Sequence, residues 1–451
     1  MLLVCDNDNR NTFANYSCGI DFIEGFVNAS EQGWQANYGS RKLHSHFQAI
    51  YSLAHQEVVG YEGLLRAHDQ SQNPVPPSEL FAERTDLFDS VFLDRLSRYL
   101  HVSNFTGMKN DNDWLFLNVS PKVVVSGKLY GDFFHALLAR TGMDPRRVVV
   151  EIVEDEIGDE DKLAEAVEYY RGLGCLIAID DFGKGHSNFN RIWQLQPEIV
   201  KLDQSFIQQA TANINARRIL TRLVSLIHES GSLVLLEGIE TESEALLAID
   251  SGTDFVQGYY FSRSNTGLIG TNTSFQKLCH TYRSHTDIEL QRSMSISERY
   301  QQTLQQSAQT LSQGEAIETA CRALLALPYV QRCYLLDHDG WLIQHCAVNK
   351  PDNAQGKSRF TPLNRNKGMV WSQWREILKA WNNNGQVYTG KPHLSIKDSV
   401  LCRTLSITLE VDGKELLLNC DIDAIGFDHA DDGVVYKTPA MPKTNRLLSA
   451  I

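Results

Sequence analysis

The chain has 451 residues, more than one hydrophobic core usually organises, so two domains are expected. Its composition, 42% hydrophobic and 22% charged, is that of a globular protein and excludes a disordered or fibrous chain. The net charge of −13 argues against a protein that coats long nucleic acid, but carboxylates that hold divalent cations can still bind a small phosphorylated ligand.

Nothing in the sequence predicts export from the cytoplasm. The opening MLLVCDNDNR lacks the basic start and apolar core of a signal peptide, and no run of about 18 apolar residues occurs. The nine cysteines, from Cys5 to Cys420, include no CxxC pair and no zinc-like spacing with histidine, so we interpret them as ordinary thiols. We therefore expect a cytoplasmic protein with no membrane span.

Short apolar runs alternate with amphipathic stretches over residues 40–265, a pattern typical of an α/β domain. Eight runs with intervening helical stretches predict a TIM-type (β/α)8 barrel, preceded by an N-terminal extension over 1–39. In chain order the runs are HFQAIYSL, EVVGYEGLLR, DWLFLNVS, RVVVEIVE, GCLIAIDDFG, IVKLDQSF, LVLLEGIE and FVQGYYF.

Most of these runs end on a polar residue, and the carboxyl ends of barrel strands meet at one mouth. Oxygen ligands gathered there suit hard cations such as Mg²⁺ or Mn²⁺, and two such ions can stabilise both oxygens of a phosphoryl displacement. A lysine among them can orient a water, and the last glutamate can bind a metal or accept a proton. The residues are Glu62, Asn118, Glu151, Asp180, Asp181, Lys201 and Glu237.

Taken singly, these residues have simpler explanations. A lone carboxylate is most often solvated, and the pair Asp180 and Asp181 could cap a helix. Their shared position at strand ends favours the metal site over these alternatives. Four histidines have no metal-binding spacing, and we assign them to solvent-facing or supporting roles: His44, His46, His55 and His186.

The motifs FQAI, EGLLR, LNVS, EIVE, IDDFGKGHSN, KLD, EGIE and QGYYF occur in the order found in the EAL domain, and residues 40–265 resemble that family. The resemblance implies hydrolysis of cyclic di-GMP to linear pGpG by a barrel that usually dimerises. It implies that Glu62, Asn118, Glu151 and Asp180 hold one metal and that Asp180, Asp181 and Glu237 surround a second, with Lys201 orienting water.

The same resemblance implies roles for residues around the metals. Gln257 helps to place the catalytic groups, Glu154 holds the loop after Asp181, and Glu240 is a supporting carboxylate. Gln48 and Arg66 contact the guanine and phosphate parts of the ligand. Ca²⁺ is expected to permit binding but to suppress cleavage, because it accepts longer and less regular coordination than Mg²⁺.

The chain departs from the family pattern at several positions. Gly63 replaces the alanine of EAL, and Ala49 stands where proline is usual. Lys184 and His186 are unusual in the loop, which puts loop mobility and dimer coupling in doubt more than the metal site. Arg263 and Ser264 follow QGYYF, where a proline is frequent.

The remainder of the chain predicts a helix and a small second domain. Residues 287–327 contain one breaker, Gly314, and are expected to form a connecting helix. Hairpins around Asp339-Gly340 and Asp412-Gly413 predict an antiparallel sheet over 328–430, and residues 431–451 are expected to be a frayed tail. This domain loosely resembles PAS/Cache sensory modules with an unknown ligand or partner; a packing or dimerisation module is an equal alternative.

Two functions follow from this sequence. The first is an active cyclic di-GMP phosphodiesterase, favoured because every expected metal ligand and Lys201 are present. The second is a receptor that binds the dinucleotide without cleaving it and signals to a partner. No segment resembles a GGDEF cyclase domain, so synthesis of the dinucleotide is not expected.

Overall fold

The computed structural model describes residues 18–31, 33–82, 87–108, 112–120, 131–153, 160–184, 189–268, 273–347, 373–395 and 400–428. The chain divides into two compact units, Met1–Tyr282 and Arg283–Ile451, and each contains its own hydrophobic core. Glu154, His186 and the predicted tail over 431–451 lie outside the described residues. In the described part of the chain, no helix has the length and apolar character needed to cross a membrane.

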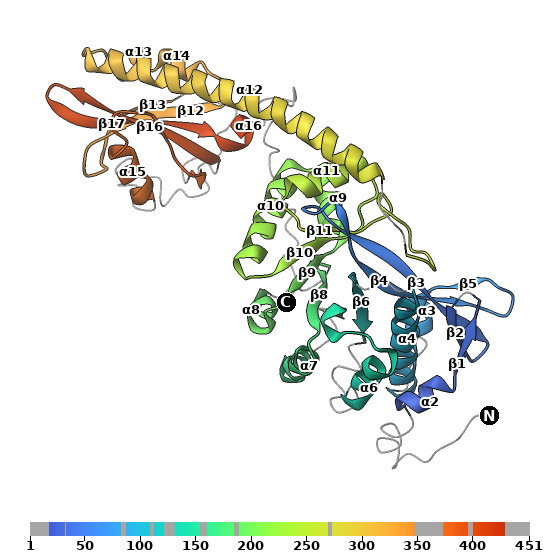
Figure 1. Cartoon of the computed structure of the whole chain (residues 1–451). Coiled ribbons are helices and arrows are strands. Elements are labelled where there is room, and N and C mark those ends of the chain that lie inside the picture. The colour runs from blue at the N-terminus through green and yellow to red at the C-terminus, as the bar shows by residue number, and fades with distance from the viewer. Residues whose placement is uncertain are drawn as a thin grey trace, which may run out of the picture. The chain divides into compact units, whose positions relative to one another are not determined.

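Eight strands of the first unit close into a barrel (Figure 1), which confirms the predicted TIM-type fold. Its closure is made by the first strand, which pairs with both the second and the last. Around the barrel the strands are β3 (Arg41–Ser52), β4 (Glu57–His68), β6 (Trp114–Val119), β7 (Val148–Val153), β8 (Leu176–Phe182), β9 (Ile199–Leu202), β10 (Leu233–Leu236) and β11 (Phe255–Val256).

The direction of one strand, β3, differs from that expected in a regular (β/α)8 barrel. β3 runs antiparallel to both of its neighbours, whereas the pairings from β4 round to β11 are parallel. The physical reason lies in the connection between β3 and β4, which is only residues 53–56. So short a link can join antiparallel strands, but a parallel pair needs a crossover of a dozen or more residues.

Helices follow the parallel strands, and three short strands extend the sheet. The structure has β1 (Val27–Ser30) and β2 (Gly33–Tyr38) paired next to β3, so part of the predicted extension over 1–39 belongs to the sheet. The third is β5 (Pro74–Val75), beside β4. The helices are α2 (Ile20–Glu24), α3 (Pro77–Ala82), α4 (Leu87–Gly107), α6 (Gly131–Thr141), the 3₁₀ turn η2 (Pro145–Arg147), α7 (Glu160–Leu173), α8 (Phe189–Leu195), α9 (Gln204–Ala212), α10 (Ile214–Glu229) and α11 (Glu242–Asp250).

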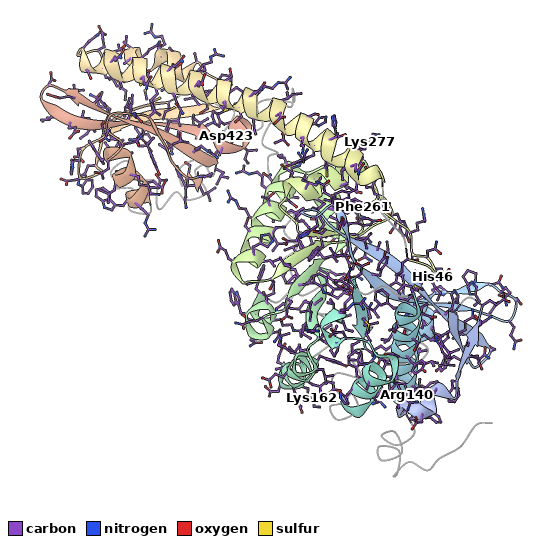
Figure 2. All side chains as sticks on the ribbon, in the orientation of Figure 1. His46, Arg140, Lys162, Phe261, Lys277 and Asp423 are labelled. Atoms are coloured by element: carbon purple, nitrogen blue, oxygen red, sulfur yellow. The ribbon has the colours of Figure 1, made fainter. Side chains whose placement is uncertain are left out.

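The predicted connecting helix differs from the structure in its bounds. Helix α12 begins earlier than residue 287, at Thr273, and ends at Ser312, before Gly314 at φ +88°. Phe275 in its first turns packs in the barrel core, where its ring centroid lies 5.8 Å from that of Phe261, labelled in Figure 2. Two short helices follow, α13 (Ile317–Ala320) and α14 (Arg322–Leu325).

The second unit is built on an antiparallel sheet of order β13-β12-β17-β16-β14, with β15 beside β16. Both predicted hairpins are confirmed, and Asp412 and Gly413 have φ values of 50° and 72°, as a tight hairpin turn requires. The remaining elements are β12 (Val330–Leu336), β13 (Leu342–Ala347), α15 (Trp374–Trp381), β14 (Tyr388–Thr389), β15 (His393–Leu394), β16 (Leu401–Val411), β17 (Lys414–Asp423) and α16 (Ala424–Asp428).

Candidate active site

Lys201 is the centre of a group of acidic side chains contributed by neighbouring barrel strands. Its Nζ lies 2.5 Å from Glu151 Oε1, 2.9 Å from Asp180 Oδ1 and 2.8 Å from Glu237 Oε1. A fourth carboxylate, Glu62, is 3.8 Å away. Because the parallel strands end at the same rim, residues far apart in the sequence meet here as predicted.

Burial and charge act in opposite directions on this lysine. Lys201 is 1% exposed, and burial alone would lower its pKa. The surrounding carboxylates, Asp180 and Glu151 foremost, outweigh that effect and raise the pKa of Lys201 well above its usual value. The side chain is therefore a fixed positive charge.

The carboxylates outnumber the positive charge that faces them. Glu151 is fully buried, and burial raises its pKa well above the usual value even though Lys201 opposes the shift. Oε1 of Glu151 faces the Lys201 ammonium, whereas Oε2 is buried without a hydrogen-bond partner in the described part of the chain. Burial likewise raises the pKa of Glu237 to about 8, against the effect of Lys201. A second cation at this site would relieve both costs.

Asp180, Asp181 and Glu237 form a compact group of potential metal ligands, with one oxygen of each within 4.8 Å of the others. Successive side chains of a regular strand point to opposite faces. Asp181 breaks that rule because its φ is 56°, in the left-handed region that non-glycine residues rarely adopt. Its backbone N–H donates to Asp180 Oδ1 at 2.9 Å, and Lys184 Nζ lies 3.0 Å from its Oδ2. Backbone strain of this kind is found mainly at functional sites.

Glu62 is held by amide groups on both sides of its carboxylate. Asn118 Nδ2 donates to Oε1 at 3.0 Å, and Gln257 Nε2 donates to Oε2 at 2.7 Å. Gln257 Oε1 is buried without a hydrogen-bond partner among the described residues. Glu62, Asn118 and Gln257 thus form one connected group with the carboxylates around Lys201.

A pocket of 240 Å³ opens beside these residues. It is lined by five residues singled out in the sequence and also by Gln204 and Tyr259, which sequence reasoning missed. Tyr259 is 54% exposed, and the guanidinium of Arg263 lies 4.3 Å from its ring centroid. The aromatic pair in QGYYF was the available signal. The pocket is lined by Gln48, Glu62, Gln204, Glu237, Gly238, Glu240, Gln257, Gly258 and Tyr259.

The two predicted ligand-contacting residues differ in their surroundings. Gln48 lines the pocket and donates to the carbonyl of Ser262 at 3.2 Å. Arg66 is not among the residues that line it; its guanidinium donates to Leu65 O at 3.0 Å and Ser264 Oγ at 2.9 Å. Ser264, one of the two residues found in place of the expected proline, is thus a partner of Arg66.

A buried network on α4 supports the end of β6 and was also missed. Asp94 Oδ1 accepts from the backbone N–H of Ser120 at 2.8 Å, two residues after Asn118. The same carboxylate pairs with Arg98, which also donates to Tyr170 Oη at 3.2 Å. Arg98 and Asp94 are 1% and 4% exposed. No sequence motif marks them, because their partners come from other elements.

The described histidines take no part in a potential metal group: His44 stacks on His68, and His55 Nδ1 is 2.9 Å from Ser52 Oγ. The oxygen set does fit hard divalent cations, which prefer carboxylate and amide ligands. Two observations of the site support that fit: the converging oxygens of Asp180, Asp181 and Glu237, and the buried Oε2 of Glu151, which has no hydrogen-bond partner among the described residues.

The chain was compared with known proteins. It is 26% identical over 318 residues to the uncharacterized EAL-domain containing protein YkuI of Bacillus subtilis, covering 65% of this chain and 74% of that protein. It is 27% identical over 225 residues to cyclic di-GMP phosphodiesterase RocR of Pseudomonas aeruginosa, covering 49% and 57%. The chain spans between about a third and three quarters of the length of the curated relatives first matched.

Among solved structures, the B. subtilis YkuI protein, in complex with substrate c-di-GMP and calcium, has a similar fold. The TM-score is 0.70 at 21% sequence identity, with 84% of this chain and 96% of that chain covered. This share reaches beyond the barrel into the second unit. The family model described as EAL domain matches residues 32–264, more than half of the sequence. The chain therefore belongs to the EAL-domain family.

Proposed function

We propose that this protein hydrolyses cyclic di-GMP to linear pGpG with the help of two divalent cations, Mg²⁺ or Mn²⁺. The observation that carries the proposal is the group of four carboxylates within 4 Å of Lys201 Nζ, beside a pocket of 240 Å³. The Pseudomonas relative is named as an enzyme of this activity, and the Bacillus YkuI protein binds c-di-GMP, which supports the choice of substrate.

The cations would be held by oxygen ligands at the strand ends and would neutralise phosphate charge and activate a water for attack. One of them would be surrounded by Asp180, Asp181 and Glu237. The proposed ligand set is Glu62, Asn118, Glu151, Asp180, Asp181 and Glu237, the residues that the family resemblance implies.

The chain's own residues then divide the remaining work. Lys201, fixed and protonated, orients the attacking water and offsets negative charge on the phosphate. Glu237, which lines the pocket, accepts the proton from that water. The new bond joins the water oxygen to phosphorus, the bond from phosphorus to the 3′ oxygen breaks, and that oxygen takes a proton. In the alternative division of roles, Glu237 serves only as a ligand of the second cation and does not take this proton.

Around the reacting groups, Gln48, Arg66 and Gln257 are proposed to position the dinucleotide, with Glu154 and Glu240 in support. Gln48 and Gln257 line the pocket and suit this role by position. Arg66 donates to Leu65 O and Ser264 Oγ, which account for two of the five N–H groups of its guanidinium. The proposal also includes a cytoplasmic location, a barrel-mediated dimer and regulation by the second unit.

The direct test incubates the full chain with cyclic di-GMP and Mn²⁺ or Mg²⁺ and identifies the product by chromatography. We expect pGpG from the unmodified chain and no product from Glu62→Ala, which lacks a ligand oxygen. The matched control is Glu57→Ala, an exposed residue at the start of the same strand, which should keep full turnover. Full turnover by Glu62→Ala would show that the metal site is wrongly assigned.

A calcium arm separates the enzyme from the receptor alternative. With Ca²⁺, calorimetry should detect dinucleotide binding while chromatography detects no cleavage, because Ca²⁺ polarises a bound water less sharply than Mg²⁺. Binding with every cation and cleavage with none would favour the non-catalytic receptor. Full Mg²⁺-dependent turnover with no association in Ca²⁺ would count against a metal that holds the substrate phosphate.

A further inference from the structure

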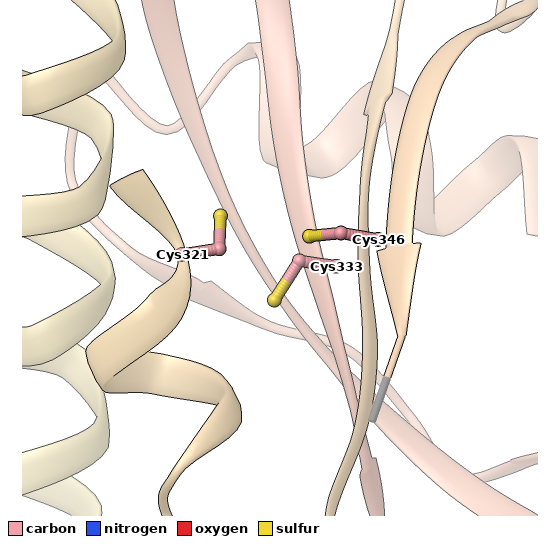
Figure 3. A group of neighbouring side chains, drawn as sticks. All are labelled: Cys321, Cys333 and Cys346. Carbon is pink, nitrogen blue, oxygen red and sulfur yellow. The ribbon is translucent and has the colours of Figure 1, made fainter. Parts of the chain in front are cut away.

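Three cysteines that are far apart in the sequence meet in the core of the second unit. Cys321 lies between α13 and α14, Cys333 on β12 and Cys346 on β13. Their sulfur atoms all lie within 4.8 Å of one another. Figure 3 shows the three side chains gathered in the layer between the short helical segment and the sheet.

The sheet register explains why two of these side chains meet. Cys333 and Cys346 are directly opposite each other on antiparallel strands, so their side chains stand on the same face. Cys420 of β17 is opposite Cys333 on its other side and is fully buried. A row of three cysteines thus crosses the sheet, with Cys321 packed over it.

We propose that Cys321, Cys333 and Cys346 bind a thiophilic divalent cation, for which Zn²⁺ is the best match, with Cys420 adjacent as a fourth possible ligand. A Zn–S bond of about 2.3 Å places the sulfurs of a tetrahedral or trigonal site about 3.8–4.0 Å apart. The observed limit of 4.8 Å therefore requires only small side-chain adjustments.

Charge balance favours a divalent ion over a monovalent soft ion such as Cu⁺. Binding releases the thiol protons, and three thiolates with Zn²⁺ leave a net charge of −1, whereas the same thiolates with Cu⁺ leave −2. Cys321 and Cys333 are 0% exposed and Cys346 is 8% exposed, and apolar residues of the second core surround them. An apolar environment penalises residual charge steeply, so the smaller imbalance is preferred.

The simpler alternative is that the thiols serve as small apolar core residues. Their arrangement argues otherwise, because three separate elements bring their sulfurs to one point. Cys402 provides the contrast: it is equally buried in the same sheet, but it is paired with Asp423 and belongs to neither the potential metal group nor the core cluster that contains the other cysteines. It therefore serves as the matched control.

The test titrates the full chain, reduced and metal-free, with Co²⁺ under anaerobic conditions. Thiolate ligands give Co²⁺ an intense near-ultraviolet charge-transfer band that the oxygen ligands of the barrel cannot produce, so the two sites are distinguished without an activity measurement. We expect the band to saturate at one equivalent and to disappear when Zn²⁺ is added. This measurement needs no variant, so it does not depend on whether a substituted chain folds.

Variants then assign the ligands. Cys333→Ser and Cys346→Ser should lower the band by about a third or more, because each removes one of three thiolates. Cys402→Ser should leave it unchanged, and thermal melts of the metal-free variants check their folding. The proposal is overturned if the unmodified chain gives no band, or if both ligand variants keep the band at full intensity. It is also overturned if mass spectrometry finds a disulfide between Cys333 and Cys346 before reduction, and if this disulfide forms again in the presence of Zn²⁺ once the reductant is removed.

Discussion

At the scale of single residues, the candidate site is governed by one buried ammonium group among several carboxylates. Removing one partner of a buried ion pair usually costs more than the pair contributes, because the other charge is left uncompensated. Lys201 contacts four side-chain carboxylates, so its loss would leave these carboxylates facing one another without a counter-ion.

We therefore predict that Lys201→Met abolishes hydrolysis and lowers the free energy of unfolding of the metal-free chain by about 3–5 kcal/mol. Mn²⁺ should restore more stability to this variant than to the unmodified chain, because a divalent cation replaces the missing charge. Melting temperatures with and without Mn²⁺ measure both effects. Lys184→Met is the control: its ammonium is 63% exposed, so its ion pair with Asp181 should be worth less than about 1 kcal/mol. Equal destabilisation by both substitutions would contradict the role of Lys201.

Gly63, the residue that departs from the family's alanine, has a structural explanation. A methyl group at this position would lie 2.9 Å from Cγ of His101, closer than carbon atoms approach in folded proteins. The imidazole cannot easily move away, because Nδ1 is 2.8 Å from Ser45 Oγ and Nε2 is 3.0 Å from Ser97 Oγ. His101 therefore occupies the space that an alanine side chain would need.

Restoring the alanine should consequently harm this chain. Gly63→Ala is expected to lower the free energy of unfolding by about 1–3 kcal/mol through overpacking. In a chain that carries His101→Ala, Gly63→Ala should cost much less. A double-mutant cycle measured by urea unfolding should therefore find the double variant more stable than the sum of the two single effects predicts. Gly107→Ala, with open space around the new methyl, is the neutral control. Additive effects of the two substitutions would show that His101 does not determine the glycine.

At the scale of elements, α4 anchors the segment that follows β6. Its Asp94 and Arg98 are one helical turn apart and buried, and Asp94 receives the Ser120 N–H just beyond Asn118. The position of a proposed metal ligand on one strand is thus linked to charges on a helix. Burial makes the pair sensitive to the loss of either member.

Asp94→Asn keeps the size of the side chain but removes its charge, so Arg98 would be left buried without a counter-ion. We expect the free energy of unfolding to fall by about 3–5 kcal/mol, as measured by chemical denaturation. Asp21→Asn supplies the comparison, because Asp21 is 85% exposed in its pair with Arg140 and should change stability by less than about 1 kcal/mol. A loss below 1 kcal/mol in Asp94→Asn would indicate that the network contributes little to the fold.

The elements also show what sequence patterns can predict. Alternating runs and polar strand ends were sufficient to predict the barrel and to name the residues that gather around Lys201, because both depend on local periodicity. The antiparallel direction of β3 was missed although the four-residue link to β4 encoded it. The α4 network and the group of Cys321, Cys333 and Cys346 could not be predicted, because they depend on which distant segments the fold brings together.

At the scale of the whole molecule, helix α12 contributes to two separate cores. Phe275 and Leu278, 1% and 0% exposed, pack in the barrel core, while Leu304 and Leu311 pack in the core of the second unit. The division between the units falls inside this helix, after Tyr282. The barrel therefore needs the first turns of α12 but not the remainder.

This division predicts different outcomes for two truncated chains. A chain that ends at Ser284 keeps Phe275 and Leu278 and should fold, bind metal and retain some turnover of cyclic di-GMP, with a changed rate or dimer affinity relative to the full chain. A chain that ends at Leu268 loses both side chains from the core. This loss should cost about 3–6 kcal/mol of apolar burial and give a lower melting temperature than that of the chain ending at Ser284. Calorimetry, product chromatography and analytical ultracentrifugation measure these properties. Equal stability of the two truncated chains would contradict the role of α12 in the barrel. Equal turnover and equal sedimentation behaviour of the full chain and the chain ending at Ser284 would contradict regulation by the second unit under basal conditions.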